Sequence, residues 1–101
     1  MTKYKAKPTY LDGIRFPSKL EASYYSKLKL RLRANDIKYF LRQIPFDLPG
    51  GVKYYCDFMV VENDGSIKYI DTKGIETATF KLKKKQVEAL FPVKIEVVKK
   101  A

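Results

Sequence analysis

The positions of hydrophobic and polar residues predict a first helix over residues 16–36. Ser18 and Glu21 have the spacing of a capping box, in which a serine caps the helix and a glutamate stands three residues later. Asn35 is a typical C-terminal stop, because asparagine tolerates the left-handed conformation that often follows a helix. Apolar residues at every fourth position predict one buried stripe, made of Leu20, Tyr24, Leu28 and Leu32.

The next part of the chain predicts three strands. Residues 37–48 are rich in β-branched and aromatic residues, and Pro45 indicates an edge strand or the exit from a strand, because proline cannot donate to a neighbour. Residues 52–62 and 66–73 flank the turn sequence Asn-Asp-Gly at 63–65 and predict a β-hairpin.

A second helix and a last strand follow. Residues 77–91 predict the helix, which Pro92 ends, and residues 93–98 predict the strand, because they alternate between apolar and polar as far as Val97. A right-handed crossover through this helix places the last strand parallel to a strand of the hairpin. The apolar side of the helix is expected to contain Phe80, Val87, Leu90 and Phe91.

These elements predict an α/β (α+β) fold with a single mixed β-sheet and an α-β-β-β-α-β core. The 101 residues are the length of one small domain, so we expect one domain over residues 1–101 with a thin core. Residues 1–9 are basic and aperiodic, which indicates an amino-terminal arm or an edge strand ending at Pro8.

The charge of the chain favours a polyanionic partner. There are 21 lysine and arginine residues against 11 aspartates and glutamates, a net charge of +10. A nucleic acid is the expected partner, and a merely basic soluble protein is the alternative. The candidate DNA-binding residues lie in the arm and on both helices: Lys3, Lys5, Lys7, Lys19, Lys81 and Lys84.

The sequence excludes several classes of site. Cys56 is the only cysteine and there is no histidine, which excludes an internal disulfide, the usual zinc sites and catalytic triads. No apolar run approaches 18 residues and no secretory signal is present, so we expect no membrane partner and a reduced, cytoplasmic location.

Two acids interrupt apolar strands. A three-residue loop at 63–65 places Asp57 directly opposite Asp71, with Cβ atoms roughly 4.5–5.5 Å apart. Lys73 projects from the same face as Asp71. Facing carboxylates repel, and a divalent cation such as Mg²⁺ would compensate. A two-residue loop would instead place the two acids diagonally across the strands. The alternative to a metal site is that Asp57 faces solvent and that Lys73 is an ordinary solvated strand lysine.

Glu21 has two possible roles. Position N3 of a capping box favours glutamate for local reasons. The helix could also pack on the sheet and point Glu21 at the two aspartates, and the sequence leaves both roles open.

This order of elements and acids resembles the PD-(D/E)xK nuclease superfamily. The stretches "DGIRFPSKLEASYY", "YYCDF" and "YIDTKG" look closest to small phage-encoded members, and the plan is similar to phage endonuclease I and the archaeal Holliday junction resolvases. Cys56 stands where the name-giving proline would be, and Asp71 stands where glutamate is commoner. The resemblance implies a restriction-endonuclease-like fold.

The resemblance also implies an activity: metal-dependent hydrolysis of DNA by an endonuclease specific for branched DNA or Holliday junctions, in phage recombination or DNA processing. Mg²⁺, with Mn²⁺ as a substitute, would be held by Asp57, Asp71 and the carbonyl oxygen of Thr72, and by Glu21 directly or through water. Lys73 would orient or help to deprotonate the attacking water, or stabilise charge on phosphorus.

The expected partners follow from the same resemblance. They are DNA and a second copy of the chain, without a nucleotide cofactor, in the host cytoplasm if the gene is phage-encoded. A thin core also favours a homodimer. The alternative is a basic DNA-binding protein without catalysis, in which the acids are structural.

Overall fold

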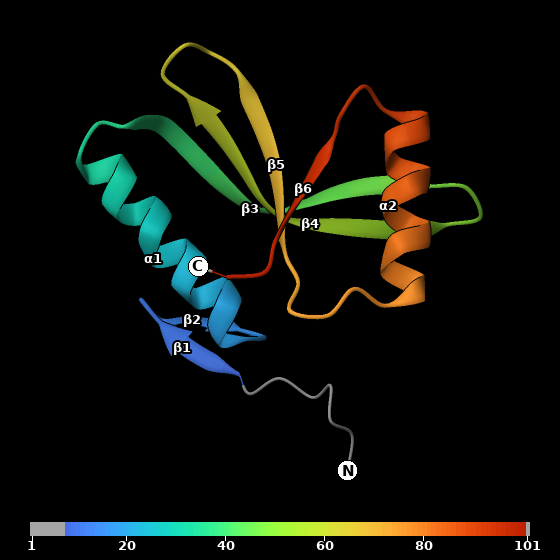
Figure 1. Ribbon diagram of the computed structural model, residues 1–101, viewed down its shortest axis with the longest axis horizontal. Helices are drawn as coiled ribbons and strands as arrows, with labels where there is room; N and C mark the ends of the chain where they lie inside the picture. The colour runs from blue at the N-terminus through green and yellow to red at the C-terminus, as the bar shows by residue number, and fades with distance from the viewer. Residues whose placement is uncertain (1–7, 101) are drawn as a thin grey trace.

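The computed structural model describes residues 8–100, so the predictions for Lys3, Lys5 and Lys7 lie outside the described residues. Figure 1 shows the order of the elements, which are β1 (Thr9–Leu11), β2 (Ile14–Phe16), α1 (Lys19–Arg33), β3 (Ile37–Leu48), β4 (Val52–Glu62), β5 (Ile67–Thr72), α2 (Ala78–Leu90) and β6 (Ile95–Val98). Neither of these helices has the length and apolar character needed to cross a membrane.

The main sheet confirms the predicted α+β class. Its four strands have the order β3-β4-β5-β6, and β3, β4 and β5 are antiparallel neighbours. β6 pairs with β5 in parallel after the crossover through α2, as predicted. β3 is an edge of the sheet, which explains why Pro45 is tolerated within it.

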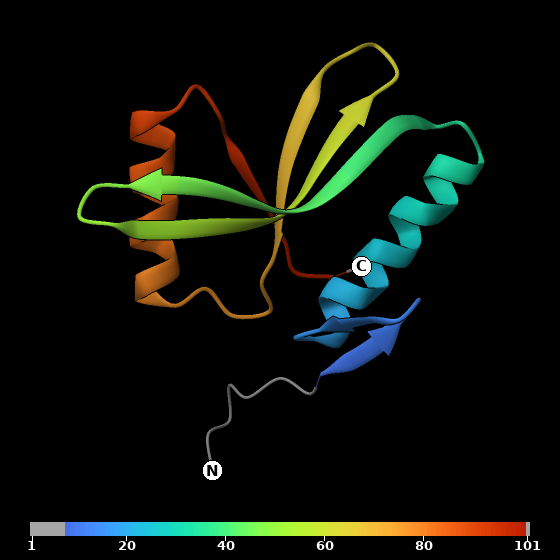
Figure 2. The same ribbon diagram turned by 180° about the vertical axis from the view of Figure 1, so that it is seen from behind.

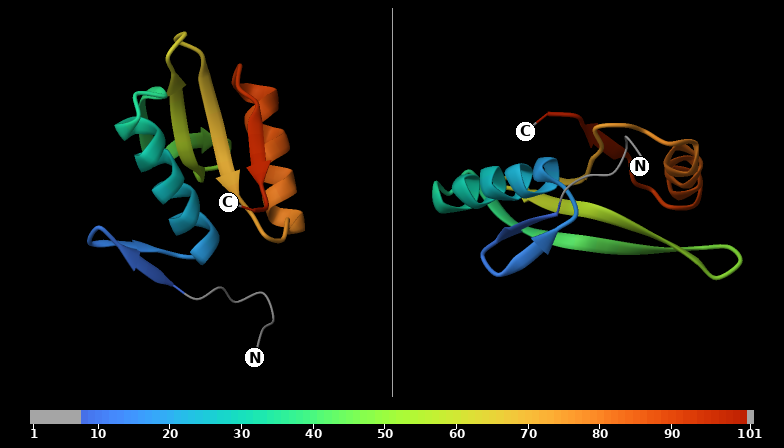
Figure 3. Two further views of the ribbon diagram at one scale, coloured as in Figure 1. Left: turned by 60° about the vertical axis from the view of Figure 1, so that its left-hand side comes forward. Right: turned by 90° about the horizontal axis from the view of Figure 1, so that it is seen from below.

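A second sheet makes the prediction of a single sheet wrong. β1 and β2 form an antiparallel hairpin in which Leu11 faces Ile14 across a two-residue loop. Asp12 and Gly13 in that loop both have positive φ, 52° and 74°, which is the conformation that Asp-Gly favours in tight hairpins. Thr9, the last residue of the predicted arm, belongs to β1, and residues 1–7 of that arm lie outside the described residues. The hairpin lies beside the first turn of α1 (Figure 3).

Both ends of α1 were predicted correctly, but its buried side was predicted only in part. The Ser18 hydroxyl accepts a hydrogen bond from the Glu21 backbone N–H at 3.1 Å, and Asn35 has a φ of 59° just after the helix. Leu32 is 37% exposed, because a repeat of four residues drifts by about 40° per step around the helix. Of the predicted stripe, Leu28 is fully buried and Tyr24 is partly buried against the core. The other buried residues of α1 are Glu21, Ala22 and Tyr25.

α2 shows the same kind of partial agreement. Its N-cap is Thr77, and Phe80 and Val87 are buried. Leu90 is 54% exposed, against prediction, since it lies about 80° around the helix from Phe80 whereas Val87 lies about 20° from it.

The β3–β4 pair serves two separate hydrophobic cores. Figures 1 and 2 show α1 beside one half of this pair and α2 beside the other, and both strands change direction between the two halves. On β4, Tyr54 and Cys56 belong to the core under α2, whereas Phe58 and Val60 belong to the core under α1. Asp57 is the residue at the change between the two cores.

Candidate active site

The predicted register of Asp57 and Asp71 is confirmed. The β4–β5 pairing ends with Phe58 and Ile70, and Asp57 and Asp71 are the next residues of the two strands in that register. Their contact differs from the expected repulsion between carboxylates. The Asp57 backbone N–H donates a 2.8 Å hydrogen bond to Oδ1 of Asp71.

Both aspartates are buried, so the solvent-facing alternative for Asp57 is wrong. Oδ2 of Asp57 accepts hydrogen bonds from the backbone N–H of Thr72 at 2.9 Å and from its hydroxyl at 2.8 Å. Asp71 is fully buried, and its Oδ2 has no hydrogen-bond partner. Burial raises the pKa of Asp71, because the charged carboxylate loses its water.

Glu21 joins this site from the first turn of α1. It is only 3% exposed, and its Oε2 accepts a 3.0 Å hydrogen bond from the side-chain amide of Gln43. Oε2 also lies 3.8 Å from a guanidinium nitrogen of Arg42. The side chain therefore points to the aspartates, while the backbone N–H of Glu21 serves the helix cap. Burial, together with the charge of Asp57, raises the pKa of Glu21 to about 7.

Gln43 is a site residue that the sequence did not reveal. On β3 it lies between the Arg42–Phe58 and Ile44–Cys56 pairs, so it faces Asp57 across the strands. Its Nε2 is 3.0 Å from Glu21 and 3.4 Å from Oδ1 of Asp57, and its φ of 55° is rare for this residue type. A glutamine in a strand carries no signal that would predict this.

Arg42 is the second residue that sequence reasoning missed. Its guanidinium carbon lies 4.6 Å from the centre of the Phe16 ring, which holds the side chain beside Glu21. Its buried Nε has no hydrogen-bond partner.

Lys73 directly follows β5 and is brought near the acids. Its backbone N–H donates to the carbonyl of Val98 at 3.0 Å, and its ammonium nitrogen lies 5.2 Å from the centre of the Phe80 ring. The positive charge of Lys73 opposes the rise in pKa of both Glu21 and Asp71.

The structure thus brings together Glu21, Asp57, Asp71, Thr72 and Lys73, yet it does not form a closed metal cage. Across residues 8–100, no three or more His, Cys, Asp or Glu side chains make a group that could hold a metal ion. Protein groups already donate hydrogen bonds to oxygens of these acids: the Gln43 amide lies between Glu21 and Asp57, and the Asp57 N–H bonds to Asp71. The chemistry of the set still fits a hard divalent cation, because buried carboxylate oxygens are its ligands and one of them, on Asp71, has no partner.

Cys56 takes no part in the site. It is fully buried, and its Sγ donates to the carbonyl of Ile70 at 3.3 Å. Burial raises the pKa of the thiol to about 12, which makes it an inert core group.

The predicted DNA-binding lysines are not equivalent. Lys19 and Lys81 are exposed at the starts of α1 and α2. Lys84 instead donates a 3.2 Å hydrogen bond to Glu88, whose carboxylate also accepts the backbone N–H of Ile95. Lys84 is therefore engaged within the protein, and Lys81 is the freer cation of the two.

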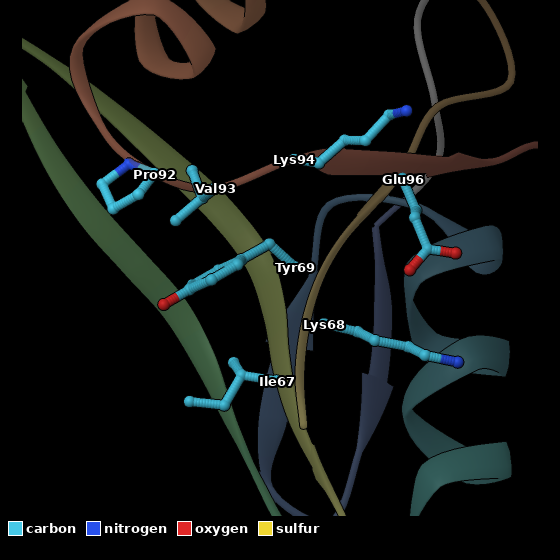
Figure 4. A pocket seen from close by; sticks show the side chains of 7 residues that line it. All are labelled: Ile67, Lys68, Tyr69, Pro92, Val93, Lys94 and Glu96. Carbon is cyan, nitrogen blue, oxygen red and sulfur yellow. The ribbon is translucent and has the colours of Figure 1, made fainter. Parts of the chain in front are cut away.

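One surface cavity lies away from the acids. It has a volume of about 620 Å³ and is formed where the start of β5 and the segment before β6 diverge (Figure 4). None of the five residues gathered at the site lines this cavity. Its lining combines apolar and charged side chains, which are Ile67, Lys68, Tyr69, Pro92, Val93, Lys94 and Glu96.

Comparison with known proteins identifies the family of the chain. Residues 1–101 match the family described as "Protein of unknown function (DUF1064)", and the chain belongs to this family. No curated protein matches the sequence.

Proposed function

We propose that this protein is a metal-dependent DNA endonuclease that hydrolyses phosphodiester bonds. The observation that carries the proposal is Oδ2 of Asp71, a buried carboxylate oxygen without a hydrogen-bond partner in a network with Asp57 and Glu21. Leaving such an oxygen unpaired is costly, and a site that binds a cation is a physical reason to keep it.

Each of the three acids has one oxygen held by a strong protein donor. Thr72 holds Oδ2 of Asp57, the Asp57 N–H holds Oδ1 of Asp71, and Gln43 holds Oε2 of Glu21. The second oxygen of Asp71 has no partner, and that of Asp57 accepts only a long hydrogen bond of 3.4 Å from Gln43. For the second oxygen of Glu21, no hydrogen bond is found among residues 8–100. These second oxygens, with the Thr72 carbonyl, would supply the ligands for Mg²⁺ or Mn²⁺.

The side chains divide the chemistry between them. When bound, the cation would lower the pKa of a water molecule and neutralise charge on the phosphate. Lys73 would add a fixed positive charge where negative charge builds on phosphorus, and its half-buried position near the acids suits this role.

The substrate and assembly form the finer part of the proposal. Lys19 and Lys81 would contact the DNA backbone, and such contacts position DNA without reading its sequence. The described part of the chain presents no motif that reads base edges. Recognition of shape, as in branched DNA or a Holliday junction, therefore suits the chain better than recognition of a sequence, and a homodimer would place two sites on a two-fold substrate.

A second candidate is a basic DNA-binding protein without catalysis. It is favoured by the hydrogen bonds of the acids, because the bonds from Thr72 to Asp57 and from Asp57 to Asp71 close the end of the β4–β5 hairpin. In that case the carboxylates would be structural and the net charge alone would bind DNA.

A cleavage assay separates the two candidates. Branched, nicked, single-stranded and plain duplex DNA are incubated with the protein in Mg²⁺, in Mn²⁺ or in EDTA. The nuclease proposal expects cleavage with a divalent ion, none in EDTA, and none from Lys73→Ala in either ion. Binding of every substrate without any cleavage in Mg²⁺ or Mn²⁺ would leave the non-catalytic protein as the function.

A further inference from the structure

The backbone of β3 is unusual at Gln43. Its φ of 55° lies in the left-handed region, which a residue with a long side chain seldom adopts. The pairing with β4 has the same register on both sides of this residue, so no bulge accounts for the conformation. Strained backbone of this kind persists where the surrounding structure needs the side chain in one place.

That place is between two buried acids. Nε2 of Gln43 is 3.0 Å from Oε2 of Glu21 and 3.4 Å from Oδ1 of Asp57. An amide nitrogen carries two hydrogens, so it can donate one to each carboxylate. A donor shared by two carboxylates stands where a bridging cation would stand.

Arg42, the neighbouring positive charge, does not take the place of the Gln43 amide as a hydrogen-bond donor to Glu21. The nearest guanidinium nitrogen of Arg42 is 3.8 Å from Glu21, beyond hydrogen-bond distance. Among residues 8–100, the side chain of Gln43 is the one hydrogen-bond donor found on the Glu21 carboxylate. Gln43 is itself an exposed residue, so its side chain has solvent into which it can move.

We propose that Gln43 is a positioning residue that acts as an amide latch. Its amide occupies the space between Glu21 and Asp57 in the metal-free protein, holds the two acids together, and must leave before a divalent cation binds between them. The latch therefore lowers the affinity of the site for a divalent cation. The identity of the ligand as a divalent cation rests on the proposed function, but metal binding is measured without DNA.

Two substitutions separate the amide from the backbone. Gln43→Met keeps the length of the side chain and the backbone conformation but removes the donor. Gln43→Gly removes the side chain and accepts a positive φ without strain. Gln86→Met, on an exposed position of α2, is the matched control for the same chemical change elsewhere.

Calorimetric titration with Mn²⁺ and melting curves in EDTA test the latch. Both Gln43 variants should bind Mn²⁺ roughly tenfold more tightly than wild type, since a hydrogen bond to a charged group no longer competes with the ion. In EDTA, Gln43→Met should melt below wild type and Gln43→Gly should lose less, because the strain is relieved. Gln86→Met should match wild type in both measurements.

The outcomes are distinct from those of the nuclease assay. Binding by the variants with none by wild type would also support the latch. Equal or weaker Mn²⁺ affinity in both variants, or no binding by any of the proteins, would overturn it. A wild type that binds Mn²⁺ but cuts no DNA would refute the nuclease and leave the latch standing.

Discussion

The backbone N–H of Asp57 donates a 2.8 Å hydrogen bond to the carboxylate of Asp71, directly across the β4–β5 hairpin. The two acids therefore do more than repel each other, because the peptide of the first supports the side chain of the second. An asparagine at position 71 keeps an oxygen for this bond, because Oδ2 of Asp71 has no partner. The charge of Asp71 can thus be removed while its hydrogen bond remains, whereas both oxygens of Asp57 accept hydrogen bonds.

Asp71→Asn tests whether the buried charge at this position is there for a metal. In EDTA its melting temperature should equal or exceed that of wild type, because burial of an ion is relieved and Oδ1 is still available to the Asp57 N–H. The rise in melting temperature that wild type gains from added Mn²⁺ should be mostly lost, since only binding to the folded state raises stability.

Asp47→Asn is the control for this substitution, because Asp47 is an exposed acid of β3 paired with Lys53. It should respond to Mn²⁺ as wild type does. An equal response from Asp71→Asn would show that Asp71 is not a metal ligand.

The sequence predicted the pairing of these acids because a hairpin leaves little freedom. Once the turn at 63–65 is located, alternation and register follow for every position of both strands, and the structure agrees with the three-residue loop. The β1–β2 hairpin was missed although Asp12-Gly13 is a strong turn signal. Its strands are three residues each, too short to show a period.

The rest of the site depends on contacts between distant elements, which a single sequence does not encode locally. Arg42 and Gln43 resemble any polar residues of an edge strand until α1 is docked and Glu21 lies against them. The role of Glu21 was open for the same reason. The capping residue fixed where α1 begins, but packing against Phe58 decided which side of the helix is buried.

The pKa of Glu21 predicts a pH dependence of stability in the metal-free protein. Burial raises this pKa from 4.5 to about 7, so the folded state binds a proton more tightly than the unfolded state. The stability contributed by protonated Glu21 is complete below pH 4.5 and is lost as the pH rises through about 7. Glu21→Gln stays neutral and keeps the helix cap, because the cap uses the backbone N–H.

Urea unfolding in EDTA between pH 5 and pH 8 measures this effect. The free energy of unfolding of Glu21→Gln minus that of wild type should increase between pH 5 and pH 8 by on the order of 2 kcal/mol, because only wild type loses stability as Glu21 ionises. Glu76→Gln is the control, because the pKa shift of Glu76 has the opposite direction: Lys99 lowers this pKa, so Glu76 does not titrate between pH 5 and pH 8. A difference between Glu21→Gln and wild type that does not change with pH would mean that Glu21 is ionised at pH 5, with Arg42 balancing its charge.

Lys81 and Lys84, two of the four lysines of α2, should differ in their effect on DNA binding. Lys81 is exposed, whereas Lys84 is bonded to Glu88. Lys81→Ala should therefore weaken binding to duplex and branched DNA alike and reduce the slope of log affinity against log salt by about 1, the value for one lost phosphate contact. Lys84→Ala should change the slope less.

Fluorescence anisotropy titrations at several salt concentrations, in EDTA to prevent cleavage, give both slopes. Melting curves of the two variants serve as the folding control. Equal slopes for Lys81→Ala and wild type would show that Lys81 makes no contact with the DNA backbone.

Thr72 has a side-chain role that was not expected, because sequence reasoning assigned it only a carbonyl ligand. Its buried hydroxyl donates a 2.8 Å hydrogen bond to Oδ2 of Asp57, beside the bond from its own backbone N–H. Thr72→Val has nearly the same shape and keeps the backbone groups. It should lose about 1.5–3 kcal/mol of stability in EDTA, the usual contribution of a hydrogen bond to a charged group, or roughly 6–24 °C in melting temperature.

The affinity for Mn²⁺ separates the two roles of Thr72. If the carbonyl oxygen is the ligand, Thr72→Val should bind Mn²⁺ within about threefold of wild type, a change of less than 1 kcal/mol. Thr79→Val, an exposed threonine of α2, should change neither quantity and controls for the substitution itself. Unchanged stability in Thr72→Val would show that the hydroxyl adds nothing to the hold on Asp57. A large loss of Mn²⁺ affinity would show that the hydroxyl, through Asp57, is what the metal site requires.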